Sequence, residues 1–522
     1  MKFLEGKFSN IISLSETATV AVLNLKIGYL YLVDRQNYKK NLTFITYHLF
    51  ADSFVMSIFQ EKLKTIRKIF IKMTEDLDFI IIGAGYAGLT AARELLKAGK
   101  TVKVLEARER VGGRVYTQQF EGFYLDMGGT WVGPTQDKIY GLIREFGLQT
   151  FPTYDEGKST LSMNGKIKNY KGLIPPLPIT SLLSLDGAIK KMTKLSKTVN
   201  LKEPWNTPNA ARWDSMTLQT WMEKQMSFGT ARKLFKIASE AIWATHPNEI
   251  SMLHAMFYTK SCTDFDTLMN VKNGAQEERI LGGAMSVALR MVESFPADTI
   301  RFNSVVKTII HNAEGVEIVG KDFNYKAKKV IVAIPPTLAG RIDYLPLLPA
   351  NRDQLLQRIP MGTVWKCYAV YDRPFWRDKG QNGLAASDEG YVSVTFDNSP
   401  KDGSKGIMMG FVLANQAKDF SLLTEDGRKS AVLNQFEGFF GKEAASPQFY
   451  IDKSWAEEEF TRGCYAGVMP TGAWTSLGKH LREPIGNIHW AGTETSEVWN
   501  GYIDGAVRSG ERAALEVMSL GN

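Results

Sequence analysis

The sequence predicts an α/β protein with more than one domain, and two observations lead to this fold class. The chain has 522 residues, 44% of them hydrophobic, and a single core rarely serves so long a chain. Residues 78–106 read as a strand, a glycine-rich turn, a helix and a second strand in immediate succession. Such a unit builds a parallel sheet, so we expect a sheet with helices on its faces and at least one further domain.

The predicted unit begins with a short apolar run. Phe79–Ile82 is apolar and β-branched, which is typical of a buried parallel strand. The segment LTAARELLKAG follows with helical spacing and ends at Gly99, a natural C-terminal cap. The segment TVKVLE is predicted to be the second strand, and it ends at Glu106.

Three glycines form a G-x-G-x-x-G pattern between the first strand and the helix. Gly83 permits the tight turn, Gly85 lets the backbone approach a pyrophosphate, and Gly88 lets the helix pack against the strand. The helix N-terminus offers free N–H groups to the phosphates. Glu106 is placed to accept hydrogen bonds from both hydroxyls of a ribose. A lone glycine pattern is weak, but in this context it predicts a dinucleotide site rather than chance glycines.

The residues after Glu106 favour FAD over NAD as the dinucleotide. ARERVGGR places Arg108, Gly112, Gly113 and Arg114 directly behind the acidic strand end. Further glycines and arginines suit a longer ligand whose phosphates and far end follow the next loop. A nicotinamide dehydrogenase with the same fingerprint is the disfavoured alternative, and it predicts NADH formation by a colourless protein.

Several separated motifs resemble one family. GFYLDMGGTWVGPTQDKI (122–139) resembles the GR2-type flavoproteins and, more specifically, the flavin amine oxidases. ILGGAMSVALRM (280–291), NSVVKTI (303–309), VIVAIPPTLAGRI (330–342) and HWAGTETSEVWNGYIDGAVRSGERAALEV (489–517) are similar to further segments of the monoamine oxidases, in the same order. The resemblance covers residues 73–522 and is weaker over 155–275.

The resemblance implies a discontinuous Rossmann-type FAD-binding domain with an inserted α+β substrate-binding domain. The FAD-binding segments are expected at 73–150, 280–350 and 458–522, and the substrate-binding segments at 151–279 and 351–457. It also implies which residues bind FAD, here given by motif: Gly83, Gly85, Gly88, Glu106, Arg108, Gly113, Arg114, Gly129, Thr130, Val305, Trp455, Cys464, Gly492, Thr493, Glu494 and Ile503.

Cys464 lies in RGCYAG, a stretch similar to the GGCYT-like stretch of the monoamine oxidases. In that family the cysteine bonds the 8α carbon of the flavin as a thioether, which makes Cys464 a candidate covalent anchor. Arg462 replaces a glycine of the family pattern and Ala466 replaces a threonine. The alternative is that FAD is held by contacts alone and that Cys464 is an inert thiol in a buried strand.

Tyr465 and Tyr502 match the two aromatic residues that flank the flavin and form a slot for the amine. Two rings on either side of the substrate would align the lone pair of the neutral amine. The alternative for each tyrosine is ordinary core packing. Lys366 lies in the apolar run after PMGTVW and matches the lysine that holds a water near flavin N5, where its charge assists the reaction with O₂. The alternative is a solvated lysine at a sheet edge.

The resemblance implies an FAD-dependent oxidase. It converts a primary amine into an imine that hydrolyses to an aldehyde and ammonia, and it reduces O₂ to hydrogen peroxide. A diamine or polyamine oxidase and an L-amino-acid oxidase of the same fold remain open, since a diamine needs a deep carboxylate and an amino acid needs an arginine. A flavin-binding protein without turnover is a further alternative. We assign no chemistry to Cys262 or Cys367, and we expect His489 in a strand near the cofactor.

The composition argues against several other classes of protein. Three cysteines argue against a disulfide framework and for a reducing compartment, and the six histidines show no metal-ligand spacing. The net charge is +8, but residues 1–72 carry a net +6, so the remainder does not suggest nucleic-acid binding. No apolar run is long enough to cross a membrane. We therefore expect a soluble cytoplasmic enzyme, with a homodimer suggested by the resemblance alone.

Residues 1–72 have an uncertain status. Their apolar patches are interrupted, and MTEDLDFIIIGAG at Met73 resembles a protein start. We expect a poorly ordered extension or an upstream start-site artefact. The alternative is a basic amphipathic segment that binds a membrane surface.

Overall fold

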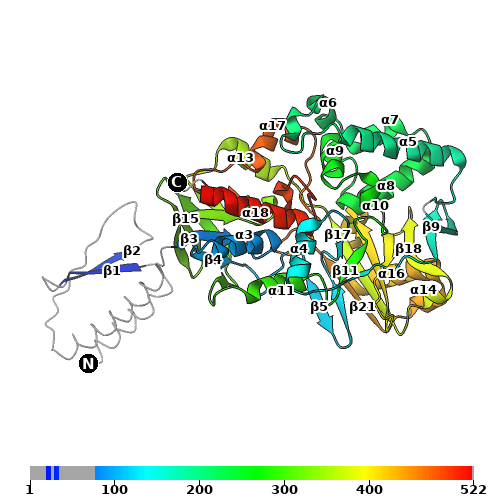
Figure 1. Ribbon diagram of the computed structural model, residues 1–522, viewed down its shortest axis with the longest axis horizontal. Helices are drawn as coiled ribbons and strands as arrows, with labels where there is room; N and C mark the ends of the chain where they lie inside the picture. Colours follow the sequence, from blue (N-terminus) through cyan, green and yellow to red (C-terminus); the bar gives the residue numbers. More distant parts are fainter. Residues whose placement is uncertain (1–18, 25–28, 35–76, 173, 520–522) are drawn as a thin grey trace. The chain divides into compact units, whose positions relative to one another are not determined.

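The computed structural model describes residues 19–24, 29–34, 77–172 and 174–519, and the chain divides into two units, Met1–Thr74 and Glu75–Asn522 (Figure 1). In the first unit, β1 (Thr19–Asn24) pairs antiparallel with β2 (Tyr29–Asp34). The rest of the expectation for residues 1–72 lies outside the described residues. Everything below concerns the second unit.

The first large sheet joins strands from three distant parts of the chain. Its order is β12-β4-β3-β15-β14-β13-β16, and β22 also pairs with β15. The pairings from β12 through β4 and β3 to β15 are parallel, as is that of β15 with β22, and β14 is antiparallel to both of its neighbours. The strands are β3 (Leu77–Ile82), β4 (Val102–Leu105), β12 (Ile300–Arg301), β13 (Val306–His311), β14 (Val316–Gly320), β15 (Asn324–Val332), β16 (Asp343–Leu345) and β22 (Ile488–Trp490).

Two helices from opposite ends of this unit cover one face of that sheet. α3 (Tyr86–Lys97) follows β3, and α18 (Ile503–Ser519) lies beside it (Figure 1). Gly510 permits the close approach, because a Cβ there would lie 2.3 Å from the carbonyl oxygen of Ala87. α3 ends as the sequence predicts, with Gly99 just beyond it at a φ of +71°.

The second large sheet has seven strands in the order β10-β9-β18-β19-β20-β17-β21. All eight residues of β17 and all eight of β20 are buried, which makes this the centre of a second core. The strands are β9 (Lys158–Met163), β10 (Lys166–Lys171), β17 (Val364–Tyr371), β18 (Gln381–Ser387), β19 (Val392–Asp397), β20 (Gly406–Leu413) and β21 (Phe449–Ser454).

A layer of helices packs beside this sheet around a large apolar cluster. These helices are α5 (Ile179–Ser196), α6 (Ala210–Asp214), α7 (Leu218–Gln225), α8 (Gly229–Trp243), α9 (Met252–Ser261) and α10 (Phe265–Met269). The other helices and strands are α4 (Asp137–Glu145), α11 (Ser286–Glu293), α12 (Pro336–Ala339), α13 (Ala350–Gln357), α14 (Phe375–Asp378), α15 (Ala414–Phe420), α16 (Glu425–Phe440), α17 (Ala473–Leu477), β5 (Thr117–Phe120), β6 (Phe123–Asp126), β7 (Trp131–Val132), β8 (Thr150–Pro152) and β11 (Glu278–Ile280).

The predicted fold class, an α/β FAD-binding fold with a substrate domain, is confirmed. The first sheet uses strands from 77–105, 300–345 and 488–490, and the second uses strands from 158–171 and 364–454. The predicted domains and their boundaries stay a prediction. Across the part of the chain that the structure describes, no helix is long and apolar enough to span a bilayer.

Candidate active site

One cavity of about 1300 Å³ gathers the residues that the sequence singled out. Its wall includes the ends of β3 and β4, the start of α3, part of β17 and the start of α18. Seventeen of the nineteen predicted site residues line it, and the exceptions are Gly88 and Glu494. Gly88 packs against Gly83, and Glu494 accepts hydrogen bonds from Arg114; Gly83 and Arg114 both line the cavity.

The glycine turn after β3 is held in shape by backbone contacts. Gly83 has a φ of +101°, which only glycine adopts easily. A Cβ on Gly88 would lie 2.0 Å from the carbonyl oxygen of Gly83, so the helix can approach the turn only at a glycine. The N–H of Gly112 donates to the carbonyl oxygen of Ala84 at 2.9 Å and ties the next loop to the turn. The N-terminus of α3 therefore opens onto the cavity.

Glu106 lies at the end of β4 and is buried, although its carboxylate forms part of the cavity wall. One carboxylate oxygen accepts from the N–H of Ala84 at 2.7 Å, and the other accepts from the N–H of Arg108 at 2.9 Å. Each oxygen keeps accepting capacity for a hydroxyl in the cavity. Contact with a ribose stays a prediction.

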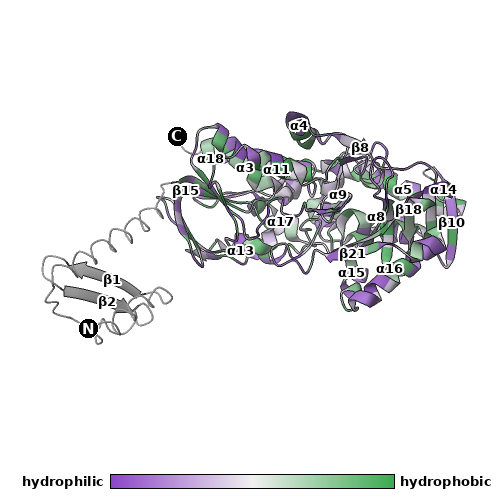
Figure 2. Cartoon of the chain, turned by 90° about the horizontal axis from the view of Figure 1, so that it is seen from below, coloured by the Kyte–Doolittle hydropathy of each residue, from purple (hydrophilic) through white to green (hydrophobic). Residues whose placement is uncertain are grey.

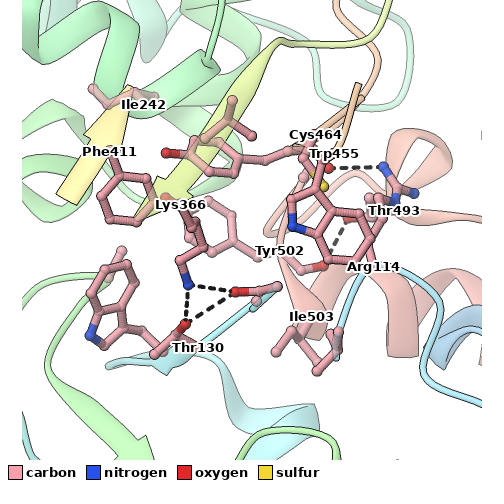
Figure 3. A pocket seen from close by; sticks show the side chains of 18 of the residues that line it. Arg114, Thr130, Ile242, Lys366, Phe411, Trp455, Cys464, Thr493, Tyr502 and Ile503 are labelled. Carbon is pink, nitrogen blue, oxygen red and sulfur yellow. Dashed lines mark hydrogen bonds between the residues drawn. The ribbon is translucent and has the colours of Figure 1, made fainter. Parts of the chain in front are cut away.

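Arg114 and Glu494 join the first and last predicted cofactor segments. The guanidinium donates to both carboxylate oxygens, at 2.5 and 3.0 Å, and to the carbonyl oxygen of Tyr465 at 3.0 Å. Glu494 also accepts from the N–H of Gly467 at 3.1 Å. Burial alone would raise the pKa of Glu494, but Arg114 outweighs it and the pKa ends below its usual value. Figure 3 shows Arg114 at the side of the cavity that also holds Thr493 and Cys464.

Lys366 lies inside the second sheet and not at its edge. β17 is flanked by β20 and β21, so the alternative of a solvated edge lysine is wrong. Its ammonium donates to the carbonyl oxygens of Asp126 and Gly128 and to the hydroxyl of Thr130, at 2.7 to 2.8 Å. These contacts point Lys366 toward Thr130 on the cavity wall (Figure 3).

Burial lowers the pKa of Lys366 to about 7, and the nearby carboxylate of Asp126 offsets part of this effect. Three acceptors around one nitrogen match the three N–H donors of the charged form. The site therefore holds a buried cation whose charge titrates near neutral pH.

Asp126 is a buried residue that the sequence analysis missed. One carboxylate oxygen accepts from the hydroxyl of Thr117 at 2.5 Å and from the N–H of Ala284 at 3.0 Å. Its carbonyl oxygen accepts from Lys366 and from the hydroxyl of Tyr368 at 2.6 Å. Burial raises the pKa of the carboxyl, and Thr117 and Lys366 offset this in part. Asp126 thus supplies the carboxyl group next to the buried lysine and fixes the strand end that holds it.

Aromatic side chains surround Tyr465 and Tyr502 in the cavity. Tyr502 lies 6.1 Å from Tyr258 between ring centroids, and Tyr465 lies 6.4 Å from Phe411. Phe411 and Tyr258 also line the cavity, together with Ile242 of α8. Sequence reasoning missed these three residues because no motif marked them. Figure 3 shows Phe411 and Ile242 on the side of Lys366 away from Ile503.

Cys464 is buried in the cavity wall and lies in a loop, so the description of it as part of a buried strand is wrong. Its N–H donates to the carbonyl oxygen of Gly362 at 2.9 Å, and the peptide bond to Tyr465 is cis. Burial raises the pKa of the thiol to about 12, an effect that Arg114 partly offsets. Trp455 lies beside it (Figure 3) and donates from its indole to the carbonyl oxygen of Met127 at 2.7 Å.

Two other residues lie apart from the cavity. Cys367 follows Lys366 in β17 and therefore points to the opposite face of the sheet, where it is fully buried. His489 is in β22, a strand as expected, but it does not line the cavity. Its ring contacts Glu516 at 2.6 Å.

The cavity fits a dinucleotide. Its volume exceeds the few hundred Å³ at the lower end of ordinary ligand sites, and it follows a continuous wall from the glycine turn to Tyr502. The glycine positions keep that wall open near the N-terminus of α3, where phosphates bind well. The wall also contains Val305, Gly492 and Thr493, which the sequence analysis assigned to the same ligand.

The chain is similar to known families and proteins. The model of the family "Flavin containing amine oxidoreductase" matches residues 86–518. The protein named AofH in Mycobacterium tuberculosis, a flavin-containing monoamine oxidase by its name, is 40% identical over 444 residues, which are 85% of this chain and 97% of that protein. The flavin-containing amine oxidase A of Bos taurus is 36% identical over 450 residues, with 85% of each chain covered.

The chain is also similar to solved structures of amine oxidases. A putrescine oxidase bound to putrescine superposes with a TM-score of 0.82 at 32% identity, covering 85% of this chain and 100% of that chain. Cyclohexylamine oxidase from Brevibacterium oxydans superposes with a TM-score of 0.82 at 31% identity, covering 85% of this chain and 99% of that chain.

Proposed function

The chain belongs to the family of flavin-containing amine oxidoreductases, and we propose that its substrate is a primary monoamine with an apolar substituent. The protein carries out FAD-dependent oxidation of an amine. The products are an imine that hydrolyses to an aldehyde and ammonia, and hydrogen peroxide from O₂. The polarity of the cavity wall supports a monoamine over a diamine or an amino acid.

The single observation that carries this proposal is the polarity of the wall near the tyrosines. Tyr465 and Tyr502 pack with two apolar clusters, which contain residues such as Phe235, Ile242 and Phe411. Asp155, Asp266 and Glu459, which also line the cavity, are all exposed to solvent. The remaining carboxylate, Glu106, is engaged at the glycine turn.

Among the described lining residues, the one buried carboxylate, Glu106, is engaged at the glycine turn, so a second ammonium deep in the cavity would lack a buried carboxylate partner and a diamine is disfavoured. An amino acid is disfavoured for a similar reason. Of the four arginines in the wall, Arg108 and Arg114 are engaged with Glu458 and Glu494, and Arg341 and Arg462 are exposed. Neither pair offers a free buried guanidinium for a carboxylate.

The residues of this chain supply binding, orientation and charge. Tyr465 and Tyr502 hold the neutral amine and exclude water from it. Lys366 holds a positive charge, fixed by Thr130 and two carbonyl oxygens, where O₂ gains negative charge. FAD, when bound, accepts the two electrons of the amine and passes them to O₂. The predicted cofactor residues, from Gly83 to Ile503, would hold it along the cavity wall.

The substrate proposal is tested with a panel of four compounds: benzylamine, tyramine, putrescine and leucine. We expect benzylamine or tyramine to give a kcat/KM at least about tenfold above putrescine and leucine, because a second charged group costs more than about 1.4 kcal/mol in an apolar wall. Peroxide release measures turnover with each compound. A higher kcat/KM for putrescine would overturn the monoamine proposal, and no peroxide with any amine would favour a flavin-binding protein without turnover.

We also propose that Cys464 binds the flavin covalently. Support comes from its position in the cavity wall beside Trp455, with Arg114 close enough to lower its pKa against the effect of burial. After acid precipitation we expect the yellow colour to stay with the pellet, and Cys464→Ala should release it to the supernatant. Cys367→Ala, on the opposite face of the sheet, is the matched control. Colour in the supernatant of the unmodified protein would leave FAD held by contacts alone.

The remaining expectations concern location and assembly. We propose that the protein acts in the cytoplasm, and the three cysteines, all free thiols, support a reducing compartment. A homodimer stays a prediction.

A further inference from the structure

Asp126 connects Lys366 to a third part of the chain, the start of α11. The carbonyl oxygen of Asp126 accepts from the ammonium of Lys366 at 2.7 Å, whereas its side chain contacts the residues before α11. One carboxylate oxygen accepts from the N–H of Ala284 at 3.0 Å and from the hydroxyl of Thr117 at 2.5 Å. The hydroxyl oxygen of Thr117 accepts in turn from the N–H of Met285 at 3.1 Å. Asp126 and Thr117 therefore bind two consecutive N–H groups at the start of this helix.

The anchor is fixed in place because α11 belongs to the core. The helix lies beside α3 (Figure 2), and its residues Val287 and Met291 are fully buried. Gly283 leaves room for the contact, because a Cβ there would lie 2.2 Å from the methyl carbon of Thr117. The carboxylate of Asp126 cannot turn away from α11 without breaking two hydrogen bonds.

The hydrogen bonds of Asp126 favour its ionised form. The second carboxylate oxygen is buried and has no hydrogen-bond partner among the described residues, so a proton on that oxygen would have no acceptor. The first oxygen accepts two hydrogen bonds next to a helix N-terminus, where negative charge is favoured. Burial raises the pKa of the carboxyl, while the hydroxyl of Thr117 and the charges of Lys366 and Arg279 lower it. The ionised carboxylate places a negative charge beside the buried ammonium.

Arg279 of β11 is the other charged side chain that faces Lys366. It is buried and donates to the carbonyl oxygen of Ser399 at 2.7 Å and to the side-chain oxygen of Asn398 at 3.3 Å. Its positive charge disfavours a charge on Lys366, whereas Asp126 favours one. The other titratable groups that face this pair stay uncharged near neutral pH, because burial raises the pKa of each; they are Cys464, Tyr86, Tyr124 and Tyr368. Among the described residues that face Lys366, Asp126 is therefore the only negative one.

We propose that Asp126 is a positioning residue for Lys366, and that its carboxylate, held by Thr117 and the start of α11, keeps the ammonium charged during turnover. The proposal rests on the role in the reaction with O₂ that is proposed above for Lys366. An amine is oxidised in its neutral form, which high pH favours, but the charge of Lys366 is lost as the pH rises through the pKa of about 7. Asp126 opposes this loss and so widens the pH range in which both conditions hold. A purely structural role of Asp126 would leave that range unchanged.

The test follows the reaction of the reduced flavin with O₂ and uses no amine. The FAD-loaded protein is reduced photochemically without O₂ and then mixed with O₂, and the rate constant of flavin reoxidation is measured over a series of pH values. We expect this rate constant to fall through about pH 7 in the unmodified protein. In Asp126→Asn the step should move lower by about 1–3 pH units, the usual effect of removing an adjacent opposite charge. A pH titration of the visible spectrum of the oxidised flavin reports the same displacement without turnover.

Asp214→Asn is the matched control. Asp214 is fully buried, accepts from the N–H and the hydroxyl of Thr475 at 2.8 and 2.9 Å, and lies outside the cavity wall. Like Asp126, it has one oxygen without a hydrogen-bond partner among the described residues. This variant should lose stability and keep the step in place. Where Asp126→Asn does not fold, Thr117→Val removes the hydroxyl that holds the carboxylate and should move the step in the same direction, while Thr117→Ser should leave it in place.

The outcomes separate this proposal from the proposed function. An unchanged step in folded Asp126→Asn would overturn the proposal, and so would an equal displacement in Asp214→Asn. If the unmodified protein shows no step and reacts with O₂ as fast as Lys366→Met does, the role of Lys366 is wrong and the proposal is overturned with it. Because no amine is used, a failure of the monoamine proposal does not affect these measurements.

Discussion

Replacing Lys366 by methionine should reduce turnover with O₂ by about 10²–10³-fold, the usual cost of removing one fixed group that stabilises developing charge. Methionine keeps much of the volume and removes the charge. Turnover with an artificial electron acceptor that does not pass through superoxide should stay within a few-fold. We measure kcat/KM for O₂ and for the artificial acceptor on the same preparation, with Lys418→Met, an exposed lysine bonded to Glu249, as the control.

The pH dependence of the unmodified protein provides a second readout of the same residue. Burial lowers the pKa of Lys366 to about 7, so its charge is present below that pH and is lost above it. We therefore expect kcat/KM for O₂ to fall as the pH rises through about 7 and to show no such step in Lys366→Met. A variant that keeps both the O₂ rate and the step would exclude Lys366 as the source of the charge.

The glycine turn and the first βαβ unit could be predicted because their determinants are local. Gly83 needs its positive φ within the turn itself, and Gly99 ends a helix whose residues are all in one stretch of sequence. The contacts of Glu106 involve Ala84, which belongs to the same unit, and Arg108, which lies two residues further along the chain. For such sites the sequence order nearly determines the geometry.

The environment of Lys366 could not be predicted in the same way. Its partners Asp126, Gly128 and Thr130 are separated from it by 236 to 240 residues, and only the packing of the end of β6 and the loop after it against β17 brings them together. The apolar run around Lys366 fitted an inner strand as well as an edge. Resemblance therefore indicated the role, while the structure determined burial and hydrogen bonding.

The burial of Asp126 could have been predicted in part from the sequence. An aspartate at the end of the apolar run FYLD indicates a buried acid with a partner, but nothing local names Thr117 or Ala284. The apolar wall formed by Tyr258 and Phe411 has the same difficulty, because isolated aromatic residues resemble core residues until the cavity is seen. The substrate side of the site is therefore less predictable than the cofactor side.

Replacing Gly88 by alanine should abolish the retention of FAD. The added Cβ would lie 2.0 Å from the carbonyl oxygen of Gly83 and 3.1 Å from its carbonyl carbon. These are backbone atoms of the turn, so the conflict cannot be relieved by rotating a side chain. The start of α3 must move away from β3, which displaces the N–H groups expected to meet the pyrophosphate. Overpacking of this kind also costs about 1–3 kcal/mol in the free energy of unfolding.

Gly141→Ala is the matched control, because this helical glycine of α4 has open space where a Cβ would lie. It should keep FAD and gain up to about 1 kcal/mol in the free energy of unfolding, since alanine favours helix over glycine. The visible spectrum of each purified variant, before and after added FAD, reports retention, and circular dichroism reports folding. A folded, fully yellow Gly88→Ala protein would mean that the cofactor does not depend on the approach of α3 to the turn.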